Sequence, residues 1–348
     1  MVYKLSRRIV VKFGGSSLKN SFGEAAELVQ HLGENNSVVV VVSALKGVTD
    51  RLLELSRNRD PCILDEMERL HERVARRVGA DISGYFEELE FVLKNPETFP
   101  SPDAWKDHLL SFGERLSAEL FSRALEGKGI PSVPVDAFHV VEARGRFGYG
   151  EVDIEKTAEK IHLIERILEN GMVPVVTGFL GNRSGFRITL GRGGSDYTAS
   201  LMGLLLNAKA VAVMSDVSGI YTADPKLVKD AFLIPFVSYH EAAMASALGM
   251  KALHEKAVEP LQDRIPLILG KTSSWKLGTL ISRVGFGWPI IAHRELEERA
   301  EISLISTTEI PEIRGYRVSK RGSGYVCFSV DKSELNHALN EIHEVIFG

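Results

Sequence analysis

The chain has 348 residues, of which 44% are hydrophobic and 25% charged, an ordinary composition for a globular protein of about two domains. Its formal net charge of −4, without a clustered Lys/Arg stripe, gives no electrostatic case for nucleic acid as a partner. No stretch approaches the roughly 18 apolar residues of a membrane span, so we expect no membrane association.

Cysteine usage and the N-terminal residues both point to the cytoplasm. Cys62 and Cys327 are the two cysteines, and they lie far apart without metal-ligand spacing. We therefore expect free thiols in a reducing compartment. The first apolar run is too short for a secretion signal and ends in Lys12, which is typical of a first strand.

Near-continuous apolar runs recur along the chain and predict buried β-strands, because a strand covered on both faces needs no polar alternation. Helical patterns lie between them, including residues 21–32, which open on a possible capping box of Ser21 and Glu24, and residues 153–171. This alternation predicts an α/β fold in which helices sandwich a mainly parallel sheet. The apolar runs are residues 9–13, 37–44, 131–137, 172–181, 210–216 and 265–270.

Three segments depart from this alternation. Residues 50–127 are helical by pattern and predict an inserted helical lobe, and residues 180–190 contain an Asn-Arg-Ser-Gly turn that predicts a hairpin. After residue 284 the sequence changes to a linker, 285–289, followed by the pattern of a strand, a second strand and a helix. Residues 285–348 therefore predict a small α+β module.

Polar loops follow the predicted strands, where ligands bind in open α/β sheets. In "KFGGSS", residues 12–17, Lys12 and the glycines suit an anion, but a glycine turn beside a surface lysine is an equal alternative. In "SALKGVTD", residues 43–50, Ser43 and Thr49 suit a polar ligand, or Thr49 or Asp50 caps the next helix. For Asp50 we favour the cap.

Two further segments carry charged residues beside glycines. In "SFGERLSAEL", Glu114 suits a substrate ammonium group, although a solvated position is the commoner fate of a helix glutamate. In "ITLGRGGSDYTAS", Arg192 suits a carboxylate or phosphate, and the glycines expose backbone N–H groups. Ser195 and Asp196 open a helix there, where Asp196 serves as an N-cap or orients an ammonium group.

Two later elements suit a nucleotide. "SDVSGIYTADPKLV" follows a buried strand and offers Asp216, Tyr221 as a stacking surface and Lys226 as a cation. "ALGMKALHEKAV" places Lys251 after a glycine. The alternatives are that Tyr221 packs in the core and that Lys251 is a surface lysine.

In this order and spacing, "KFGGSS", "SFGERLSAEL", "TLGRGGSDYTAS", "SDVSGIYTADPK" and "GMKALH" resemble the loops of aspartate kinases, which belong to the amino acid kinase family. The resemblance runs from about residue 8 to residue 283. It implies an amino acid kinase catalytic domain over residues 1–284. Residues 285–348 resemble part of an ACT domain, which implies a regulatory or dimerisation module.

The resemblance implies ATP-dependent phosphorylation of the L-aspartate β-carboxylate, the first step of lysine, threonine and methionine biosynthesis. It implies L-aspartate and ATP as ligands, Mg²⁺ carried with ATP rather than held by side chains alone, and a homodimer. The implied catalytic residues are Lys12, Asp196 and Lys251. The implied aspartate site comprises Ser43, Thr49, Glu114, Arg192 and Ser195. The implied ATP site comprises Lys12, Gly14, Gly15, Ser16, Ser215, Asp216, Tyr221, Lys226 and Lys251.

The chemistry of this reaction agrees with the implied roles. The attacking β-carboxylate has a pKa near ~3.9 and is ionised at pH 7, so no general base is needed. The barrier lies in two anions approaching each other, and cations and alignment lower it. In the resemblance Glu114 binds the α-amino group, Arg192 grips a substrate carboxylate, and Asp196 organises lysines rather than accepting a proton.

The chain departs from the family pattern in three places. Ser16 stands where the family more often has Thr, Glu255 stands where it usually has Pro, and one partial ACT-like module replaces two full ones. We therefore expect weak or no feedback regulation. Two alternatives remain, namely a kinase for glutamate, N-acetylglutamate or UMP, and an inactive amino-acid or nucleotide sensor. Glu114 and the helical lobe favour a free amino acid, and the complete set of Lys12, Asp196 and Lys251 argues against a sensor.

Overall fold

A computed structural model describes residues 7–262, 264–308 and 310–348. The chain forms two compact units. Unit 1 runs to Asp216 and includes Thr272–Trp275, and unit 2 comprises Val217–Lys271 and Lys276–Gly348. The predicted boundary at residue 284 lies inside unit 2 and stays a prediction. Among the described residues, none of the helices combines the length and the apolar character that crossing a membrane requires.

Unit 1 is built on parallel strands in the order β3-β6-β2-β1-β9. Val38–Val42 are all buried, as expected of a strand covered on both faces. The register pairs Lys12 with Val41 on one side and with Val213 on the other, so these strands end at one edge of the sheet. The predicted mainly parallel sheet is thereby confirmed. The strands are β1 (Arg7–Phe13), β2 (Asn36–Val42), β3 (Ser132–Val135), β6 (Val173–Thr177) and β9 (Ala210–Ser215).

Short helices accompany these strands. Asp153 caps its helix through the Lys156 N–H, as predicted, whereas Ser21 makes no capping hydrogen bond, so the predicted capping box is wrong. A break at Ile161 divides the predicted 153–171 helix into two. The helices are α1 (Gly15–Asn20), α2 (Phe22–Gly33), α7 (Ile154–Lys160), α8 (His162–Glu169) and α9 (Gly194–Leu205).

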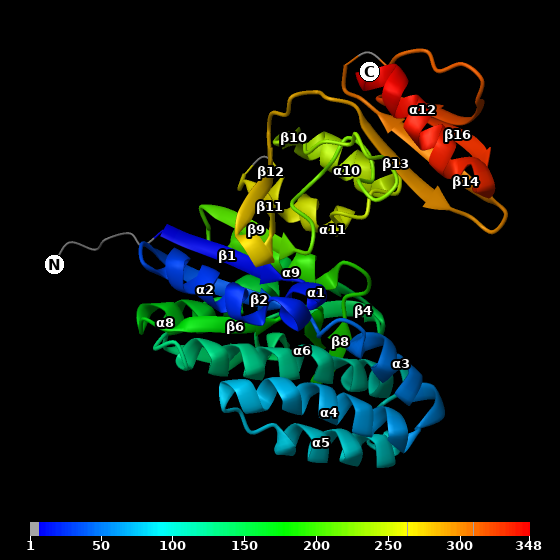
Figure 1. The fold of residues 1–348 in the computed structure, drawn as a ribbon. Helices are drawn as coiled ribbons and strands as arrows, with labels where there is room; N and C mark the ends of the chain where they lie inside the picture. The colour runs from blue at the N-terminus through cyan, green and yellow to red at the C-terminus, as the bar shows by residue number, and fades with distance from the viewer. Residues whose placement is uncertain (1–6, 263, 309) are drawn as a thin grey trace. The chain divides into compact units, whose positions relative to one another are not determined.

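The segment between β2 and β3 is helical throughout, and α4 and α5 lie alongside α6 (Figure 1). Helix α6 packs against β3 and β6 of the sheet and also against the other helices of the lobe, so it is buried along most of its length. Gly113 lets this helix approach the β2–α3 loop, since a Cβ there would lie 2.7 Å from the Cβ of Ala44. The helices are α3 (Val48–Asn58), α4 (Pro61–Val78), α5 (Ser83–Lys94), η1 (Pro96–Thr98) and α6 (Pro102–Glu126).

Two hairpins and two short helices complete the description of unit 1. The predicted hairpin is confirmed as β7 (Leu180–Arg183) and β8 (Phe186–Thr189). The other hairpin, β4 (Ala143–Arg146) and β5 (Tyr149–Val152), turns at Gly148, whose φ of +87° favours glycine. The short helices are η2 (Ala137–His139) and η4 (Thr272–Ser274).

Unit 2 begins with a mixed group of strands and helices. Strand β12 pairs parallel with β10 and antiparallel with β11, so the predicted strand at residues 265–270 does not follow the parallel pattern. Ser238 and Glu241 form a complete capping box at the start of α10. The elements are β10 (Phe236–Ser238), α10 (Tyr239–Ala247), α11 (Glu255–Val258), η3 (Glu259–Leu261), β11 (Leu267–Lys271) and β12 (Lys276–Ser282).

The C-terminal part of unit 2 is an antiparallel sheet of order β13-β14-β16-β15, joined by helix α12. The sequence pattern predicted two strands and a helix here, and β13 and β15 are additional. Strand β15 escaped prediction because its residues, RVSKRG, are polar and almost all exposed. The elements are β13 (Ile290–Glu295), β14 (Arg299–Ile305), β15 (Arg317–Gly322), β16 (Tyr325–Asp331), η5 (Lys332–Glu334) and α12 (Leu335–Phe347).

The apolar core of this sheet recruits residues from far upstream. Ala223 and Val228 belong to one buried cluster with Phe328 and Leu339. A buried hydrogen bond of 2.9 Å also joins Thr222 Oγ1 to His343 Nε2. The segment that follows β9 is therefore an integral part of the C-terminal module.

Candidate active site

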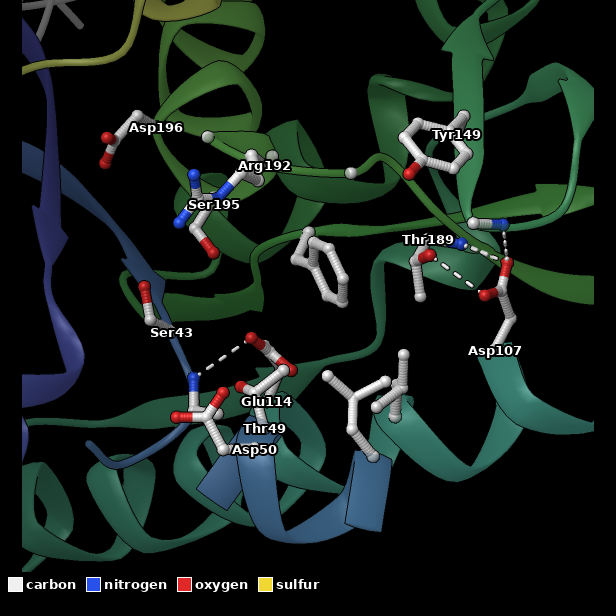
Figure 2. A pocket seen from close by; sticks show the side chains of 18 of the residues that line it. Ser43, Thr49, Asp50, Asp107, Glu114, Tyr149, Thr189, Arg192, Ser195 and Asp196 are labelled. Carbon is white, nitrogen blue, oxygen red and sulfur yellow. Dashed lines mark hydrogen bonds between the residues drawn. The ribbon is translucent and has the colours of Figure 1, made fainter. Parts of the chain in front are cut away.

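A cavity of about 530 Å³ opens in unit 1 where β1 and β2 end, and Figure 2 shows its lining. Its walls come from the β2–α3 loop, α3, α6, the β4–β5 turn and the loop that leads into α9. Residues that lie far apart in the sequence thus line one cavity. The predicted site residues among its lining are Lys12, Ser43, Thr49, Glu114, Arg192, Ser195 and Asp196.

Lys12 and Asp196 form an ion pair in this cavity. Lys12 Nζ lies 2.5 Å from Asp196 Oδ1, and Lys12 is only 8% exposed. The N-cap of α9 is Gly193, with φ of +73° and no side-chain cap, while Asp196 lies in the first turn. The alternative that Asp196 serves as an N-cap is therefore wrong. The carboxylate instead fixes a buried ammonium group at the end of β1.

Glu114 is buried rather than solvated, at 3% exposed. Its Oε1 accepts a 3.0 Å hydrogen bond from the Ala44 N–H, and its Oε2 has no hydrogen-bond partner among the described residues. Burial raises the pKa of Glu114 to about 8, although the Ala44 hydrogen bond and the charge of Lys12 act in the opposite direction. The site thus holds a buried carboxyl with one unused oxygen, which suits a cationic ligand group.

The loop before α9 presents an exposed arginine on a tightly folded backbone. Gly191 has φ of +75°, and a Cβ on Gly194 would lie 2.9 Å from the Phe179 ring. Arg192 is exposed at the cavity wall and has no ion-pair partner in the described part of the chain. These glycines therefore serve close packing and turn geometry, and they leave the guanidinium available to an anion.

Helix α3, which follows the β2–α3 loop, begins at a glycine and has no side-chain cap. Gly47, with φ of +89°, is the N-cap of α3, so the predicted cap by Thr49 or Asp50 is wrong. Both side chains line the cavity instead.

In the glycine loop after β1, Gly14 and Gly15 make close contacts with neighbouring segments of the chain. The Gly14 N–H donates to the Met214 carbonyl at 3.1 Å, and Gly15 and Ser16 form the first residues of α1. A Cβ on Gly15 would lie 2.3 Å from the Ala44 carbonyl oxygen. Gly15 is therefore required by the approach of the neighbouring loop.

The remaining predicted ATP residues are divided between the units. Ser215 ends β9 and Asp216 follows it in unit 1, whereas Tyr221, Lys226 and Lys251 belong to unit 2. Tyr221 is half-buried, and Lys251 is exposed. Their assignment to ATP stays a prediction.

Asp107 is a cavity residue that the sequence analysis missed. It is 1% exposed, and its Oδ2 accepts from the Gly148 N–H at 2.7 Å and from the Thr189 N–H at 2.8 Å. Its Oδ1 accepts from Thr189 Oγ1 at 2.9 Å, and burial raises its pKa. One carboxyl on α6 thus holds both the β4–β5 turn and the end of β8 (Figure 2). The other cavity residues that were missed include Lys106, Tyr149, Phe179 and Thr189.

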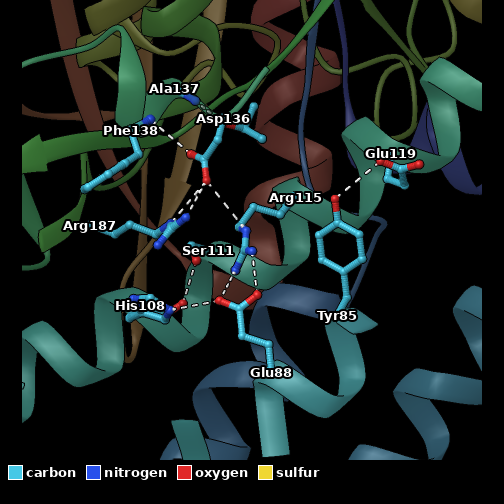
Figure 3. A network of polar contacts seen from close by, with 11 residues as sticks. Tyr85, Glu88, His108, Ser111, Arg115, Glu119, Asp136, Ala137, Phe138 and Arg187 are labelled. Carbon is cyan, nitrogen blue, oxygen red and sulfur yellow. Dashed lines mark hydrogen bonds and ion pairs between the residues drawn. The ribbon is translucent and has the colours of Figure 1, made fainter. Parts of the chain in front are cut away.

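A network of charges supports α6 outside the cavity (Figure 3). Arg115 donates two hydrogen bonds to Glu88 of α5. Arg187 of β8 forms an ion pair with Asp136, in which Nη2 lies 2.7 Å from Oδ2. Burial favours the neutral form of Glu88, but its interactions with His108 and with the Arg115 guanidinium outweigh burial and hold the pKa of Glu88 at about 2. These pairs fix the helix that carries Glu114.

The comparisons with known proteins agree with this geometry. The model of the family described as "Amino acid kinase family" matches residues 7–271. Lysine-sensitive aspartokinase 3 of Escherichia coli is 30% identical over 329 residues, which are 90% of this chain and 72% of that protein. The chain belongs to the aspartokinases of the amino acid kinase family.

Other relatives of this aspartokinase show the same family and fold. Aspartokinase 1, chloroplastic, of Arabidopsis thaliana is 33% identical over 296 residues, 79% of this chain and 52% of that protein. The crystal structure of E. coli aspartokinase III in complex with aspartate and ADP matches with a TM-score of 0.85 and 24% identity over 98% of this chain and 100% of that chain. The predicted amino acid kinase fold is confirmed. The chain spans about half the length of the Arabidopsis relative.

Proposed function

We propose that this aspartokinase transfers the γ-phosphoryl group of ATP to the β-carboxylate of L-aspartate through the cavity described above. The observation that carries the proposal is one cavity lined by the Arg192 guanidinium and a buried carboxyl oxygen of Glu114, neither of which has a partner among the residues that the structure describes. An amino acid brings the two complementary groups, an ammonium and a carboxylate. Aspartate and ADP in the related E. coli structure support this pair of substrates.

In the proposed complex Glu114 receives the α-ammonium group and Arg192 receives the α-carboxylate. Ser43, Thr49 and Ser195 supply hydroxyl groups along the same wall. The cationic ligand favours the ionised form of Glu114, so aspartate binding lowers the pKa of this carboxyl. Between this lowered pKa and the value of about 8 in the free protein, the binding of aspartate therefore releases a proton from the protein.

The transfer itself needs charge neutralisation rather than proton abstraction. A β-carboxylate oxygen forms a bond to the γ-phosphorus while the bond to the β–γ bridging oxygen breaks, and ADP leaves with the electron pair. Lys12 places a positive charge beside the approaching anions, and Asp196 holds that ammonium in position. The proposal also assigns Lys251 to the phosphates, with Gly14, Gly15, Ser16, Ser215, Asp216, Tyr221 and Lys226 around ATP.

We infer that Mg²⁺ enters with the nucleotide. Mg²⁺ usually retains water and binds through phosphate oxygens with one or two carboxylates. Within the described ranges, no group of three or more His, Cys, Asp or Glu side chains is arranged to hold a metal, and Asp196 already pairs with Lys12. These residues fit a metal that comes with ATP, where it neutralises phosphate charge.

The variant Arg192→Lys tests the proposal. Lysine keeps the charge but loses the planar fork, so we expect the KM for aspartate to rise about 10- to 100-fold while the KM for ATP changes less than about twofold. The measurement is hydroxamate formation from aspartyl phosphate, with Arg183→Lys on the nearby hairpin as the control. A larger rise in the KM for ATP than in the KM for aspartate would contradict the proposal, because it would indicate that the loop of Arg192 contacts the nucleotide.

The same assay separates the alternative functions. Activity with glutamate, N-acetylglutamate or UMP in place of aspartate would favour another kinase of the family. Normal ATP binding by Lys12→Ala, together with no phosphoryl transfer by the wild type, would favour a sensor.

We also propose that feedback regulation is weak and that the C-terminal module supports a homodimer. The dimer proposal rests on the C-terminal module, in which β13, β14, β15, β16 and α12 form one four-stranded sheet with a helix in the described part of unit 2. Titration of the activity with lysine, threonine and methionine tests the first point, and strong inhibition by any of them contradicts it. Sedimentation of the full chain tests the second.

A further inference from the structure

A second cavity in unit 1, of about 400 Å³, is strongly basic. Its walls come from α1, from the β2–α3 loop together with α3, and from α4. None of its lining residues is shared with the candidate active site. The lining residues are Lys19, Lys46, Gly47, Arg51, Glu66, Arg69, Leu70 and Arg73.

Most cations of this basic cavity lack an acidic partner among the residues that the structure describes. Glu66, the one acidic residue of the lining, pairs with Arg51. In the described part of the chain, Lys19, Lys46, Arg69 and Arg73 have no ion-pair partner. A hollow surrounded by like charges focuses a positive potential, which draws in a multivalent anion.

The size and the residue types of the basic cavity narrow the ligand. The volume of about 400 Å³ lies in the range of small-molecule sites, roughly 300–1,000 Å³. The basic cavity is a hollow, whereas macromolecules more often bind to flat surfaces. Arg69 and Arg73 stand one helical turn apart on α4, and guanidinium forks match the oxygens of phosphate groups. A small anion with more than one phosphate charge therefore suits the site.

The β2–α3 loop forms a wall of both cavities. Lys46 and Gly47 line the basic cavity, while Ala44 and Thr49 on either side of them line the candidate active site. The Lys46 N–H donates to the Gly15 carbonyl at 3.1 Å, which ties the same loop to the start of α1. An anion held by Lys46 therefore acts on the loop that carries substrate-site residues.

We propose that the basic cavity binds a small phosphate-bearing anion as an effector and that its occupancy changes the use of aspartate through the β2–α3 loop. The effect on aspartate rests on the proposed function, whereas the binding of the anion does not. The source of the anion is free polyphosphate or a phosphorylated metabolite, and both share this chemistry.

Binding is tested with inorganic pyrophosphate by calorimetry on the full chain. We expect saturable binding that weakens at least tenfold in Arg69→Gln/Arg73→Gln. The control Arg76→Gln/Arg77→Gln removes two exposed arginines of the same helix outside the cavity, and it should keep the affinity within about twofold. Lys12→Met should also retain binding, which separates this site from the proposed phosphate site. Absence of saturable binding, equal loss in both double variants, loss in Lys12→Met, or an equal response to sulfate at matched ionic strength would overturn the proposal.

The coupling is tested by the KM for aspartate at fixed ATP and excess Mg²⁺. Pyrophosphate should shift this KM at least threefold in the wild type and in the control pair, but not in Arg69→Gln/Arg73→Gln. Binding without a shift of KM in an active enzyme would overturn the effector role. If the enzyme lacks aspartate kinase activity, the proposed function fails while the binding result stands.

Discussion

At the scale of single residues, the carboxyl of Glu114 combines burial with an unused oxygen in the candidate active site. Its pKa of about 8, against an ordinary value of 4.5, arises because burial outweighs the Ala44 hydrogen bond and the attraction of Lys12. In the unfolded chain this carboxyl releases its proton near pH 4.5. The stability that it contributes is therefore full below pH 4.5 and is lost as the pH rises to about 8.

The variant Glu114→Gln removes this titration. We expect the free energy of unfolding of the wild type to fall relative to that of the variant between pH 4.5 and pH 8, by an amount on the order of a few kcal/mol. Urea denaturation across this pH range measures the difference, and Glu126→Gln, at the exposed end of the same helix, is the control. Parallel pH profiles for Glu114→Gln and the wild type would contradict the raised pKa.

Sequence reasoning found residues whose neighbours along the chain reveal their role and missed those whose partners are distant. Lys12 follows an apolar strand and precedes glycines, and Arg192 stands between glycines, so both were predicted. Asp107 lies between Lys106 and His108 on a helix and looks like a solvated residue. Its partners, Gly148 and Thr189, come close only in the folded chain.

Asp107→Asn tests the part that this residue plays in positioning the substrate loops. The amide presents one acceptor oxygen and an NH₂ group, so at least one of the three hydrogen bonds is lost, at about 1–3 kcal/mol of stability. We expect the KM for aspartate to rise about tenfold, because Thr189 leads directly into the loop of Arg192, while the KM for ATP stays nearly constant. Equal rises in both KM values would indicate a general loss of structure instead.

At the scale of elements, α1 and the β2–α3 loop can pack closely because Gly15 has no side chain. Gly15 leaves no room for a Cβ against the Ala44 carbonyl, and the Lys46 N–H bonds to the Gly15 carbonyl. The approach of Ala44 could not be predicted from the sequence, because a close backbone neighbour from a distant loop leaves no trace in the local pattern. The assignment of Gly14 and Gly15 to ATP stays a prediction. The strands and helices themselves were predictable, since their burial repeats locally.

Gly15→Ala tests this contact. A Cβ 2.3 Å from a backbone oxygen forces the loop away from α1, so we expect a loss of at least 1–3 kcal/mol in the free energy of unfolding and a raised KM for aspartate. Gly23→Ala is the matched control, because this glycine lies inside α2 with nothing within 4 Å of the added Cβ. There the substitution should stabilise the helix by up to about 1 kcal/mol. Chemical denaturation and steady-state kinetics measure both variants, and equal effects would contradict the steric argument.

At the scale of the whole molecule, the change of sequence character near residue 284 suggested a catalytic part and an appended module. One compact unit comprises Val217–Lys271 and Lys276–Gly348, so it also contains the segment with Tyr221 and Lys226, and the boundary at residue 284 stays a prediction. The sequence could not reveal this grouping, because the buried partners of Ala223 and Val228 extend from Ile291 to Ile342, which is 63 to 119 residues further along the chain.

A truncation after residue 284 tests the grouping. Removal of the C-terminal sheet and α12 leaves Ala223 and Val228 without their apolar partners and Thr222 without His343. We expect the segment 217–231 to lose its fixed structure, with rapid proteolysis there and loss of ATP binding. The full chain carrying His343→Ala, which keeps the apolar core, should resist cleavage in this segment. A truncated chain with wild-type protease resistance at 217–231 would contradict the shared core.

Two distant segments of the chain contribute to this apolar core, and this limits which recombinations between relatives keep the core intact. Of the thirteen buried residues in the cluster around Phe328 and Leu339, two, Ala223 and Val228, are encoded upstream of β11 and β12, and eleven are encoded downstream of these strands. A C-terminal module from a relative, joined at residue 285, would therefore meet an Ala223 and a Val228 that had not been selected to pack against it. Exchange by recombination is therefore expected to preserve the stretch from Val217 to Gly348 as one heritable block, so that the segment 217–231 and the C-terminal module evolve together.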